Sequence, residues 1–234
     1  MKAIILAAGK GTRMLPLTEK VPKVLIKIAG RPYLWYVLRN LWGAGIKEFG
    51  IVVGYKQEKI REFIEKEKIP NVTFIEQKEQ LGTGHALMQA RRFAGNEKFL
   101  VINGDNLFSK NDIKQILNKS KNAIAGFDVK NPSVYGVLIA DKDKLIEIEE
   151  KPENPPSNLV NTGLYFFESE IFEKLESLNK SERNEYELTD AITALAKESK
   201  MLVYKLNDYW IDLGKLEDIP KVEARIRELF GSKH

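Results

Sequence analysis

Phosphate chemistry is the first possibility that the sequence raises, because a glycine-containing loop with a cation follows the first apolar run. The segment Leu6–Arg13 reads LAAGKGTR, with two glycines ahead of a hydroxyl and a guanidinium. Glycines let backbone N–H groups approach a phosphate closely, and the planar fork of Arg13 can bridge two phosphate oxygens. An ordinary turn after a strand would also fit. The P-loop pattern is absent, and Met14 replaces the third glycine of G-x-G-x-x-G.

A second cation stands ten residues further on, where Lys23 follows Pro22 and leads into the apolar run Val24–Ile28. If that run is a strand, Lys23 could point into the same pocket as Arg13 and bind a second phosphate. Taken alone, it is one of 28 lysines, and a solvated surface position is their usual place.

Another glycine-containing loop extends from Gln77 to His85. Gly82 and Gly84 would let a ligand come close, and Thr83 is typical of a helix N-cap. The side chain of Gln77 offers both a donor and an acceptor, which suits the edge of a pyrimidine. A capped helix entrance with no ligand explains the loop equally well, and a lone His85 fits a structural residue in the first helical turn.

Two aspartates follow apolar runs. Asp105 follows the apolar run Phe99–Ile102 after two intervening residues, and Asp212 ends the run that begins at Tyr209. In an open α/β sheet, ligands bind beyond the carboxyl ends of strands, and Mg²⁺ takes one or two protein carboxylates besides phosphates and waters. Each aspartate alone could simply form a turn, but the pair predicts a magnesium site.

Polar residues also flank a proline-rich loop at positions 151–158. Glu150 and Lys151 precede it, and Asn161 and Thr162 follow it. Carboxylate and amide groups bind sugar hydroxyls, and a lysine binds a sugar phosphate. Loop and strand-edge hydrogen bonding would account for the same residues without any ligand.

The composition narrows the chemistry to carboxylates, lysines, arginines, backbone N–H groups and a hard metal ion. The 234 residues include no Cys and two His, which excludes thiol catalysis and disulfides and disfavours histidine-based metal sites. The net charge of +4 reflects a surface of mixed sign, which indicates no nucleic-acid partner. The 28 Lys and 24 Glu against five Gln favour a thermophilic source.

No apolar run approaches the roughly 20 residues that a membrane span needs. The short run Ala3–Ala8 is followed at once by Lys10 and Arg13, which is typical of a buried first strand rather than a signal peptide. We therefore expect a cytoplasmic protein without a membrane partner.

The elements that must position these residues alternate in type through the first half, which predicts a parallel sheet with right-handed crossovers. Strands are expected at Lys2–Ala7, Val24–Ile28, Phe49–Val53, Val72–Ile75 and Phe99–Asn103, and helices at Tyr33–Trp42, Gln57–Lys68 and Thr83–Phe93. Closely spaced strands after residue 120 predict antiparallel pairing over part of the sheet. Those strands are expected at Ala123–Val129, Tyr135–Ala140, Leu145–Glu149, Val160–Phe167, Met201–Leu206 and Tyr209–Asp212, and the later helices at Ser169–Leu178, Glu187–Lys197 and Leu216–Phe230. No linker divides the chain, so one α/β domain over residues 1–234 is predicted.

The ordered series of motifs resembles the sugar-1-phosphate nucleotidylyltransferases. The similarity is carried by Leu6–Arg13, Pro22-Lys23, Gly30–Pro32, Leu81–Leu87, Gly104-Asp105, Glu150–Pro152, Asn161–Gly163, Tyr186–Asp190 and Trp210–Gly214. This resemblance implies a single Rossmann-like, three-layer α/β domain with a mixed, mostly parallel sheet. Since the chain ends at His234, no left-handed β-helix domain of the kind found on many relatives is expected.

The resemblance also implies roles for the candidate residues. The base and its nucleotide would be bound by Ala8, Gly9, Gly11, Thr12, Gln77, Gly82 and Thr83. Arg13 and Lys23 would act on the reacting phosphates, and Asp105 and Asp212 would hold Mg²⁺. The sugar phosphate would be bound by Gly136, Glu150, Lys151, Asn161 and Thr162.

The implied reaction joins an NTP and a sugar-1-phosphate into an NDP-sugar and releases pyrophosphate. The Gln77–His85 loop resembles uridylyltransferases for N-acetylglucosamine-1-phosphate, whereas Glu150–Pro152 and Trp210–Asp212 are more similar to glucose-1-phosphate thymidylyl- and uridylyltransferases. UTP or dTTP is therefore expected with either sugar. A cytidylyltransferase for a polyol or other non-sugar phosphate, a glycosyltransferase of related fold and a non-catalytic nucleotide-sugar-binding regulator are the alternatives. A homo-oligomer is compatible with the family.

Overall fold

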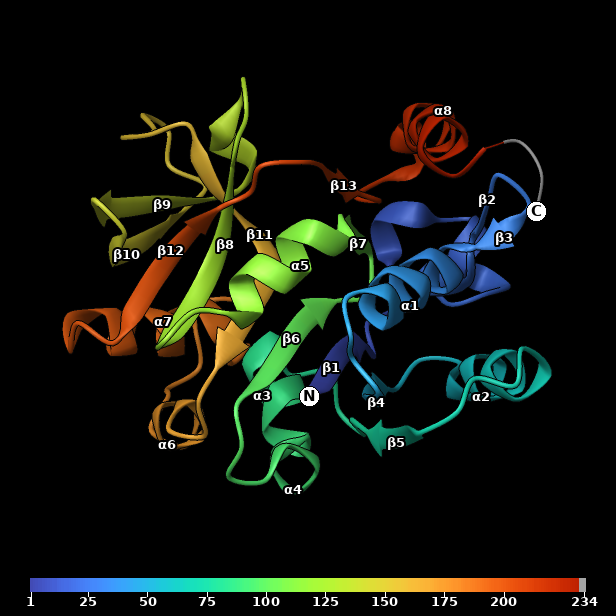
Figure 1. Ribbon diagram of the computed structural model, residues 1–234, viewed down its shortest axis with the longest axis horizontal. Coiled ribbons are helices and arrows are strands. Elements are labelled where there is room, and N and C mark those ends of the chain that lie inside the picture. Colours follow the sequence, from blue (N-terminus) through green and yellow to red (C-terminus); the bar gives the residue numbers. More distant parts are fainter. Residues whose placement is uncertain (232–234) are drawn as a thin grey trace.

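A central sheet runs through the whole molecule in the computed structural model, which describes residues 1–231 (Figure 1). Its strands in chain order are β1 (Lys2–Ala7), β4 (Glu48–Val53), β5 (Val72–Glu76), β6 (Phe99–Asn103), β8 (Asn122–Asp128), β9 (Gly136–Asp141), β10 (Lys144–Glu150), β11 (Leu159–Phe167) and β12 (Met201–Lys205). Their order across the sheet is β5-β4-β1-β6-β11-β8-β12-β10-β9. The predicted domain boundary at residue 234 lies outside the described residues.

The sheet changes character between β6 and β11. The pairs β5–β4, β4–β1, β1–β6 and β8–β12 are parallel, whereas β11 is antiparallel to both β6 and β8, and β10 is antiparallel to both β12 and β9. The mixed sheet is thus confirmed, with its parallel strands concentrated in the N-terminal half. Within residues 1–231 no left-handed β-helix is present, as expected.

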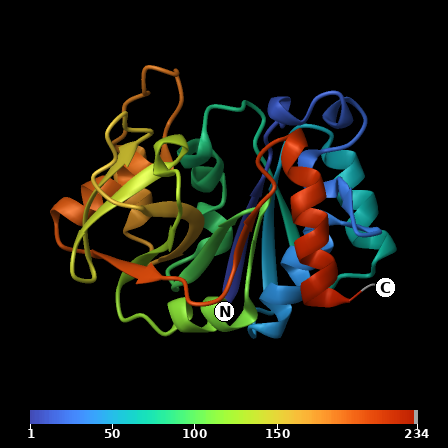
Figure 2. The same cartoon turned by 90° about the horizontal axis from the view of Figure 1, so that it is seen from above.

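Helices cover both faces of this sheet and give the three expected layers. They are α1 (Tyr33–Gly43), α2 (Gln57–Lys66), α3 (Thr83–Gln89), α4 (Arg91–Ala94), α5 (Lys110–Leu117), α6 (Ile171–Glu176), α7 (Leu188–Lys197) and α8 (Ile219–Phe230). Figure 2 shows α8 beside the N-terminal elements, at the side of the molecule opposite the strands of the C-terminal half. No helix within residues 1–231 is both long and apolar enough to cross a membrane.

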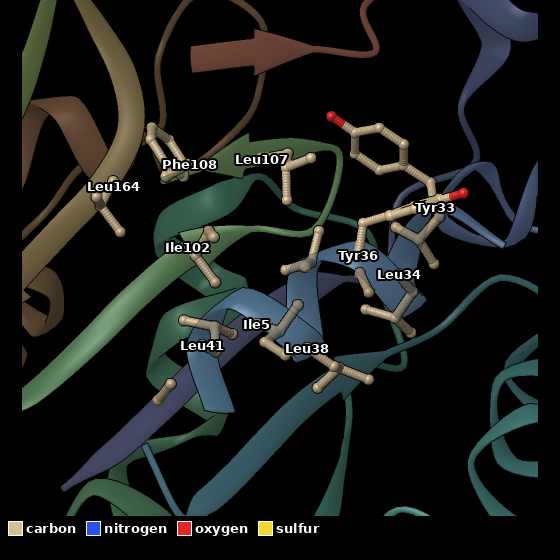
Figure 3. Packing of buried hydrophobic residues seen from close by; sticks show 14 of the residues in the cluster. Ile5, Tyr33, Leu34, Tyr36, Leu38, Leu41, Ile102, Leu107, Phe108 and Leu164 are labelled. Carbon is tan, nitrogen blue, oxygen red and sulfur yellow. The ribbon is translucent and has the colours of Figure 1, made fainter. Parts of the chain in front are cut away.

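The strands supply two apolar cores because successive side chains point to opposite faces. Ile5 and Ile102 join the core beneath α1, α2, α5 and α8, part of which Figure 3 shows, whereas Ile4 and Val101 join the core beneath α3, α6 and α7. All four side chains are buried on every side. A strand that is covered on both faces therefore needs a continuous run of apolar residues.

Several expected elements differ from the prediction. Val24–Ile28 is not one strand: residues Lys23–Leu25 form a 3₁₀ turn, and only β2 (Lys27–Ile28) pairs, with β3 (Arg31–Pro32). The helix predicted at Thr83–Phe93 is interrupted at Ala90 and forms α3 and α4.

Two elements after β6 were not predicted at all. The short strand β7 (Asn106–Phe108) pairs antiparallel with β13 (Trp210–Asp212), outside the main sheet. Helix α5 follows, with Ser109 as its N-cap and Ile113 and Ile116 buried. A strand of three residues has too little length to show a periodicity, so this pairing leaves no local signal.

Candidate active site

A cavity of about 750 Å³ opens at the carboxyl ends of β1 and β6. This is the edge at which a parallel sheet binds ligands. Ten of the predicted site residues line the cavity: Ala8, Gly9, Gly11, Thr12, Arg13, Lys23, Gln77, Gly82, Thr83 and Asp105. The structure therefore brings the predicted nucleotide and phosphate residues together around one space.

The glycine loop after β1 approaches Lys23 closely. Gly11 has φ +64°, and a Cβ on it would lie 3.0 Å from both the Cβ of Lys23 and the Cγ2 of Thr18. The Thr18 hydroxyl donates to the Gly11 carbonyl at 3.0 Å, and the Tyr55 N–H donates to the Ala8 carbonyl at 3.1 Å. These bonds hold the loop in place, and only glycine fits position 11 without strain.

Lys23 and Asp105 form the central ion pair of the cavity. Their Nζ and Oδ2 atoms lie 2.6 Å apart, and Lys23 is only 9% exposed. Lys23 begins its 3₁₀ turn, while Asp105 follows β6 by two residues. Two segments far apart in the sequence thus place a cation beside the predicted metal ligand.

Asp212 lies next to Asp105 through the β7–β13 ribbon. Asp212 pairs with Asn106 in register, and the Leu213 N–H donates to the Asp105 carbonyl at 3.0 Å. Burial and, next, the negative charge of Asp105 raise the pKa of Asp212 to about 6, although Lys23 and Arg13 oppose the shift.

This electrostatic arrangement fits a divalent cation. Two neighbouring carboxylates repel each other, and a cation between them removes that repulsion. No third His, Cys, Asp or Glu completes a metal-binding cluster within residues 1–231. Mg²⁺ suits such a pair because it keeps waters and takes phosphate oxygens as its other ligands.

Asp105 is oriented by residues for which no role was predicted. The Asn106 amide donates to Asp105 Oδ1 at 2.9 Å, and the Trp210 indole N–H donates to Asn106 Oδ1 at 2.6 Å. Tyr33 donates its hydroxyl to the Ile211 carbonyl at 2.8 Å. The pKa of Tyr33 is raised well above its ordinary value by burial and then by the charge of Asp105, so this donor keeps its proton.

Gln77 is buried and its amide nitrogen is already engaged. Nε2 lies 3.1 Å from the Gly82 carbonyl and 3.0 Å from Nδ1 of His85. No hydrogen bond to its Oε1 is formed within residues 1–231, which leaves an acceptor at the cavity wall. His85 therefore orients Gln77 from the first turn of α3, in line with its predicted structural role.

The hydroxyl of Thr83 does not cap α3, contrary to the prediction. Gly82 occupies the N-cap position, and Thr83 is the first helical residue. Its Oγ1 accepts the Leu188 N–H at 3.2 Å, so it binds the start of α7 instead. The reason is tertiary, because residues around Tyr186 pack directly against Gly82 and the start of α3.

The predicted sugar residues form a second group outside the cavity lining. Glu150 pairs with Gly136 in the β9–β10 register, and a Cβ on Gly136 would lie 3.1 Å from Oε2 of Glu150 and 3.8 Å from the Cβ of Asn161. The absence of a side chain at Gly136 thus leaves space between a carboxylate and an amide. Lys151 is exposed beside them, with Nζ 3.7 Å from Oε1 of Glu150.

A close contact joins the two groups. Gly163 has φ +80°, and a Cβ on it would lie 2.4 Å from Nδ2 of Asn103, which lines the cavity. Asn161 and Gly163 lie on one face of β11, and the Gly163 N–H donates to Asn161 Oδ1 at 3.0 Å. Because side chains alternate along a strand, Thr162 points to the other face. It is 1% exposed and donates to the Ala125 carbonyl, so the geometry does not support its side chain as a sugar contact.

Four further polar residues line the cavity without having been predicted: Lys10, Gln80, Asn103 and Glu185. Gln80 lies in the same loop as Gln77, and Asn103 stands two residues before Asp105, so their motifs were noticed but given no role. Glu185 reaches the cavity from a distant segment, next to Tyr186, and only the fold could show it.

Known proteins of similar sequence and structure show the family of this chain. The family described as "Nucleotidyl transferase" matches residues 2–228. The bifunctional protein GlmU of Methanocaldococcus jannaschii is 46% identical over 94% of this chain and 52% of its own length. The chain thus spans about half the length of that relative.

Two further comparisons extend over nearly the full length of both chains. The UTP–glucose-1-phosphate uridylyltransferase AglF of Haloferax volcanii is 36% identical, with 97% of each chain covered. A crystal structure of a UDP-glucose pyrophosphorylase complexed with UDP-glucose is 27% identical, with a TM-score of 0.88 and coverage of 97% and 98%. On the family match and on this geometry, the chain belongs to the nucleotidyl transferase family, among the sugar-1-phosphate nucleotidylyltransferases.

Proposed function

We propose that this protein transfers a nucleotidyl group from UTP or dTTP to glucose-1-phosphate or N-acetylglucosamine-1-phosphate, with release of pyrophosphate. The observation that carries the proposal is the Lys23–Asp105 ion pair, 2.6 Å long, which faces the glycine loop in the cavity and has Asp212 beside it. Cations and carboxylates placed in this way suit the transfer of a nucleotidyl group. This reaction needs no thiol or histidine nucleophile from the protein, because a phosphate oxygen of the second substrate attacks.

The residues of this chain would act by binding and orienting. The N–H groups of the glycine loop and the guanidinium of Arg13 would bind the triphosphate, and Lys23 would neutralise charge that develops near the α-phosphorus. An anionic phosphate oxygen of the sugar phosphate forms the new P–O bond, and the bond from the α-phosphorus to the bridging oxygen breaks. Pyrophosphate leaves with the electron pair of that bond. Because the attacking phosphate oxygen is already an anion, no proton needs to be removed from it.

Asp105 and Asp212 would hold the magnesium ion. When bound, Mg²⁺ supplies charge neutralisation to the phosphates beside it. The raised pKa of Asp212, about 6, and its cause in burial and the neighbouring Asp105 support this assignment.

The preference for uracil or thymine rests on Gln77. Its amide nitrogen is engaged with Gly82 and His85, so Oε1 is the atom that remains for a ligand. An amide oxygen accepts the N3–H of uracil or thymine, whereas N3 of cytosine carries no hydrogen. The name of AglF, a UTP–glucose-1-phosphate uridylyltransferase, points in the same direction.

The sugar would be bound by the second group. Glu150 and Asn161 offer a carboxylate and an amide around the space above Gly136, which suits two hydroxyls of a hexose. Lys151 would bind the sugar phosphate from the exposed side. The contact between Gly163 and Asn103 supports placing this group next to the cavity.

A substrate matrix tests the proposal. Purified protein would be incubated with Mg²⁺ and each of UTP, dTTP, CTP, ATP and GTP against glucose-1-, N-acetylglucosamine-1- and mannose-1-phosphate, with pyrophosphate as the readout. We expect UTP or dTTP with one of the first two sugars to give the fastest release. A clear preference for CTP, ATP or GTP would contradict the role of Gln77, and no release with any pair would contradict the reaction.

A further inference from the structure

The two proposed metal ligands depend on a very short ribbon. Strands β7 and β13 have only three residues each, and they pair as Trp210 with Phe108, Ile211 with Leu107 and Asp212 with Asn106. Asp105 directly precedes β7. Such a small ribbon has few hydrogen bonds of its own, so the relative position of the two carboxylates must be set by contacts beyond it.

A buried carboxylate fastens the end of the ribbon that lies away from the metal ligands. Asp112, on the first turn of α5, is 1% exposed. Its Oδ1 accepts the Tyr204 hydroxyl at 2.8 Å and the Asn207 N–H at 2.9 Å, and its Oδ2 accepts the Ser109 hydroxyl and the Asp208 N–H, both at 3.0 Å.

Three of these four donors come from the two arms of the ribbon, and the fourth, Tyr204, lies on β12 of the main sheet. Ser109 directly follows β7, whereas Asn207 and Asp208 lie just before β13. No Lys or Arg forms an ion pair with Asp112 within residues 1–231. A buried charge with neutral donors alone is costly to keep and is strongly directional, which points to a specific positional role.

A second buried side chain joins the same two arms. The Asn40 amide, on α1, donates to the Phe108 carbonyl at 2.7 Å and to the Tyr209 hydroxyl at 2.9 Å. Phe108 ends β7, and Tyr209 immediately precedes β13. The arms are therefore fixed to each other by two independent polar groups, of which Asp112 makes the larger number of contacts.

We propose that Asp112 is a positioning residue that sets the separation of Asp105 and Asp212 and thereby the affinity of the metal site. This inference rests on the proposed magnesium-dependent function. Asp112 is linked to Asp212 through the bond from Asp208 and the chain that follows it, and to Asp105 through the bond from Ser109 and strand β7. It is not a catalytic residue, because neither of its oxygens lines the cavity.

Direct metal binding tests the proposal without any turnover. The probe is Mn²⁺ in the presence of UTP, with the free ion measured by electron paramagnetic resonance. Asp112→Asn keeps the size of the side chain but places an amide nitrogen where Oδ1 or Oδ2 accepts two donors. We expect the half-saturating Mn²⁺ concentration to rise about tenfold, as for other residues that orient metal ligands indirectly.

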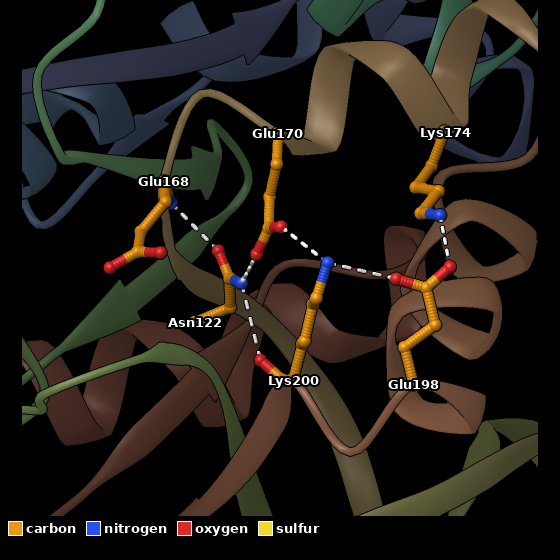
Figure 4. A network of polar contacts seen from close by, with 6 residues as sticks. All are labelled: Asn122, Glu168, Glu170, Lys174, Glu198 and Lys200. Carbon is orange, nitrogen blue, oxygen red and sulfur yellow. Dashed lines mark hydrogen bonds and ion pairs between the residues drawn. The ribbon is translucent and has the colours of Figure 1, made fainter.

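A matched control separates position from general destabilisation. Asn122 is also 1% exposed; it donates to Oε1 of Glu170 at 2.8 Å and to the Lys200 carbonyl at 3.2 Å, and accepts the Glu168 N–H at 2.7 Å (Figure 4). It begins β8, at the opposite end of that strand from the Gly126 that pairs with Asn161. We expect Asn122→Ala to lower the melting temperature but to leave Mn²⁺ affinity within twofold of wild type.

If Asp112→Asn does not fold, Tyr204→Phe removes a single donor to the carboxylate and should raise the half-saturating Mn²⁺ concentration about two- to threefold. An unchanged affinity in a folded Asp112→Asn or in Tyr204→Phe would overturn the inference, as would an equal loss in Asn122→Ala. Absence of Mn²⁺ binding in the wild-type protein would overturn the proposed metal site itself, and the inference with it.

Discussion

At the scale of single residues, the ion pair of Lys23 and Asp105 is the point where loss of one side chain should affect the chemistry most. We expect Lys23→Ala and Asp105→Ala each to lower the rate of pyrophosphate release by about 10²–10³, because each removes a preorganised charge at the reacting phosphates. Binding of the NTP should partly survive, since the glycine loop and Gln77 remain.

Initial rates of pyrophosphate release and calorimetric titration with UTP would measure both effects. Lys20→Ala, at an exposed lysine three residues before Lys23, is the matched control and should leave the rate unchanged. Turnover near that of the wild type in either site variant would remove that residue from the proposed mechanism.

Asp212, a proposed metal ligand, should lower the unfolding free energy of the metal-free protein. Its folded-state pKa of about 6 lies above the ordinary 3.8, so the native state holds the proton more tightly than the unfolded state does. Ionisation of Asp212 therefore lowers the stability of the metal-free protein as the pH rises from about 4 to about 6, and the full cost is present above that range. It is at most about 3 kcal/mol, because one pKa unit corresponds to about 1.4 kcal/mol.

Asp212→Asn should thus raise the unfolding free energy of the metal-free protein at pH 8, and this gain should vanish near pH 4. Urea unfolding at both pH values in the presence of a chelator would measure it. Asp128→Asn, at an exposed carboxylate paired with Lys205, should show no such gain. A destabilised Asp212→Asn at pH 8 would contradict the burial and repulsion assigned to this site.

At the scale of elements, β11 connects the two halves of the candidate site. Its pairing with β8 is irregular between Asn161 and Tyr165, where Gly163 takes φ +80° and approaches Asn103. Gly163→Ala places a Cβ 2.4 Å from Nδ2 of Asn103, in a backbone conformation that disfavours any side chain. We expect a loss of about 1–3 kcal/mol of unfolding free energy and a larger rise in KM for the sugar phosphate than for UTP.

Steady-state kinetics with each substrate varied in turn, together with urea unfolding, would show this asymmetry. Gly9→Ala is a useful comparison, because a Cβ there meets no atom within 4 Å and should disturb the sugar side little. Equal changes in both KM values for Gly163→Ala would mean that β11 does not separate the two functions.

The elements also show what a sequence can and cannot predict. The strand Lys2–Ala7 was predicted with the bounds it has, because a strand covered on both faces must be apolar throughout. Strand β7 was missed because a three-residue strand has no period and its partner lies about a hundred residues away. Helix α5 was overlooked although it has local signals, namely the N-cap Ser109 and the buried pair Ile113 and Ile116. The cavity residues were found where glycines or strand ends mark them, whereas Trp210, Asn106 and Asp112 act through tertiary contacts that no local pattern records.

At the scale of the whole molecule, a polar network secures the C-terminal layer far from the cavity. Glu198 pairs with Lys174 of α6 and lies 2.9 Å from Nζ of Lys200, which in turn contacts Glu170 at 2.9 Å (Figure 4). The hydrogen bonds from Lys174 and Lys200 lower the pKa of Glu198, and those to the two glutamates raise the pKa of Lys200.

This network should stabilise the protein only above acidic pH. Because the folded-state pKa of Glu198 lies below its ordinary 4.5, its contribution is present above about pH 4.5 and is lost as the pH falls through the lowered value. The melting temperature of Glu198→Gln should therefore lie below that of the wild type at pH 7 and approach it near pH 3. High salt should also reduce this difference in melting temperature, since all these side chains are partly exposed and their charges are screened.

Differential scanning calorimetry at pH 7 and pH 3, with and without 1 M NaCl, would measure both trends. Glu97→Gln is the matched control, because this mostly exposed carboxylate lies 3.8 Å from Lys2 in a pair outside the network. A melting-temperature difference for Glu198→Gln that persisted unchanged at pH 3 would show that the side chain stabilises the fold by packing rather than by charge.

The change of strand direction across the sheet has an evolutionary consequence. The residues proposed for the nucleotide lie mainly in loops of the parallel half, and those proposed for the sugar lie on β9, β10 and β11, with the contact of Asn103 and Gly163 between them. Mutations that alter the choice of sugar can accumulate on β9, β10 and β11 while the loops of the parallel half keep their specificity for the nucleotide base. A gene encoding this fold can therefore diversify one substrate at a time, without passing through an inactive intermediate that must change both.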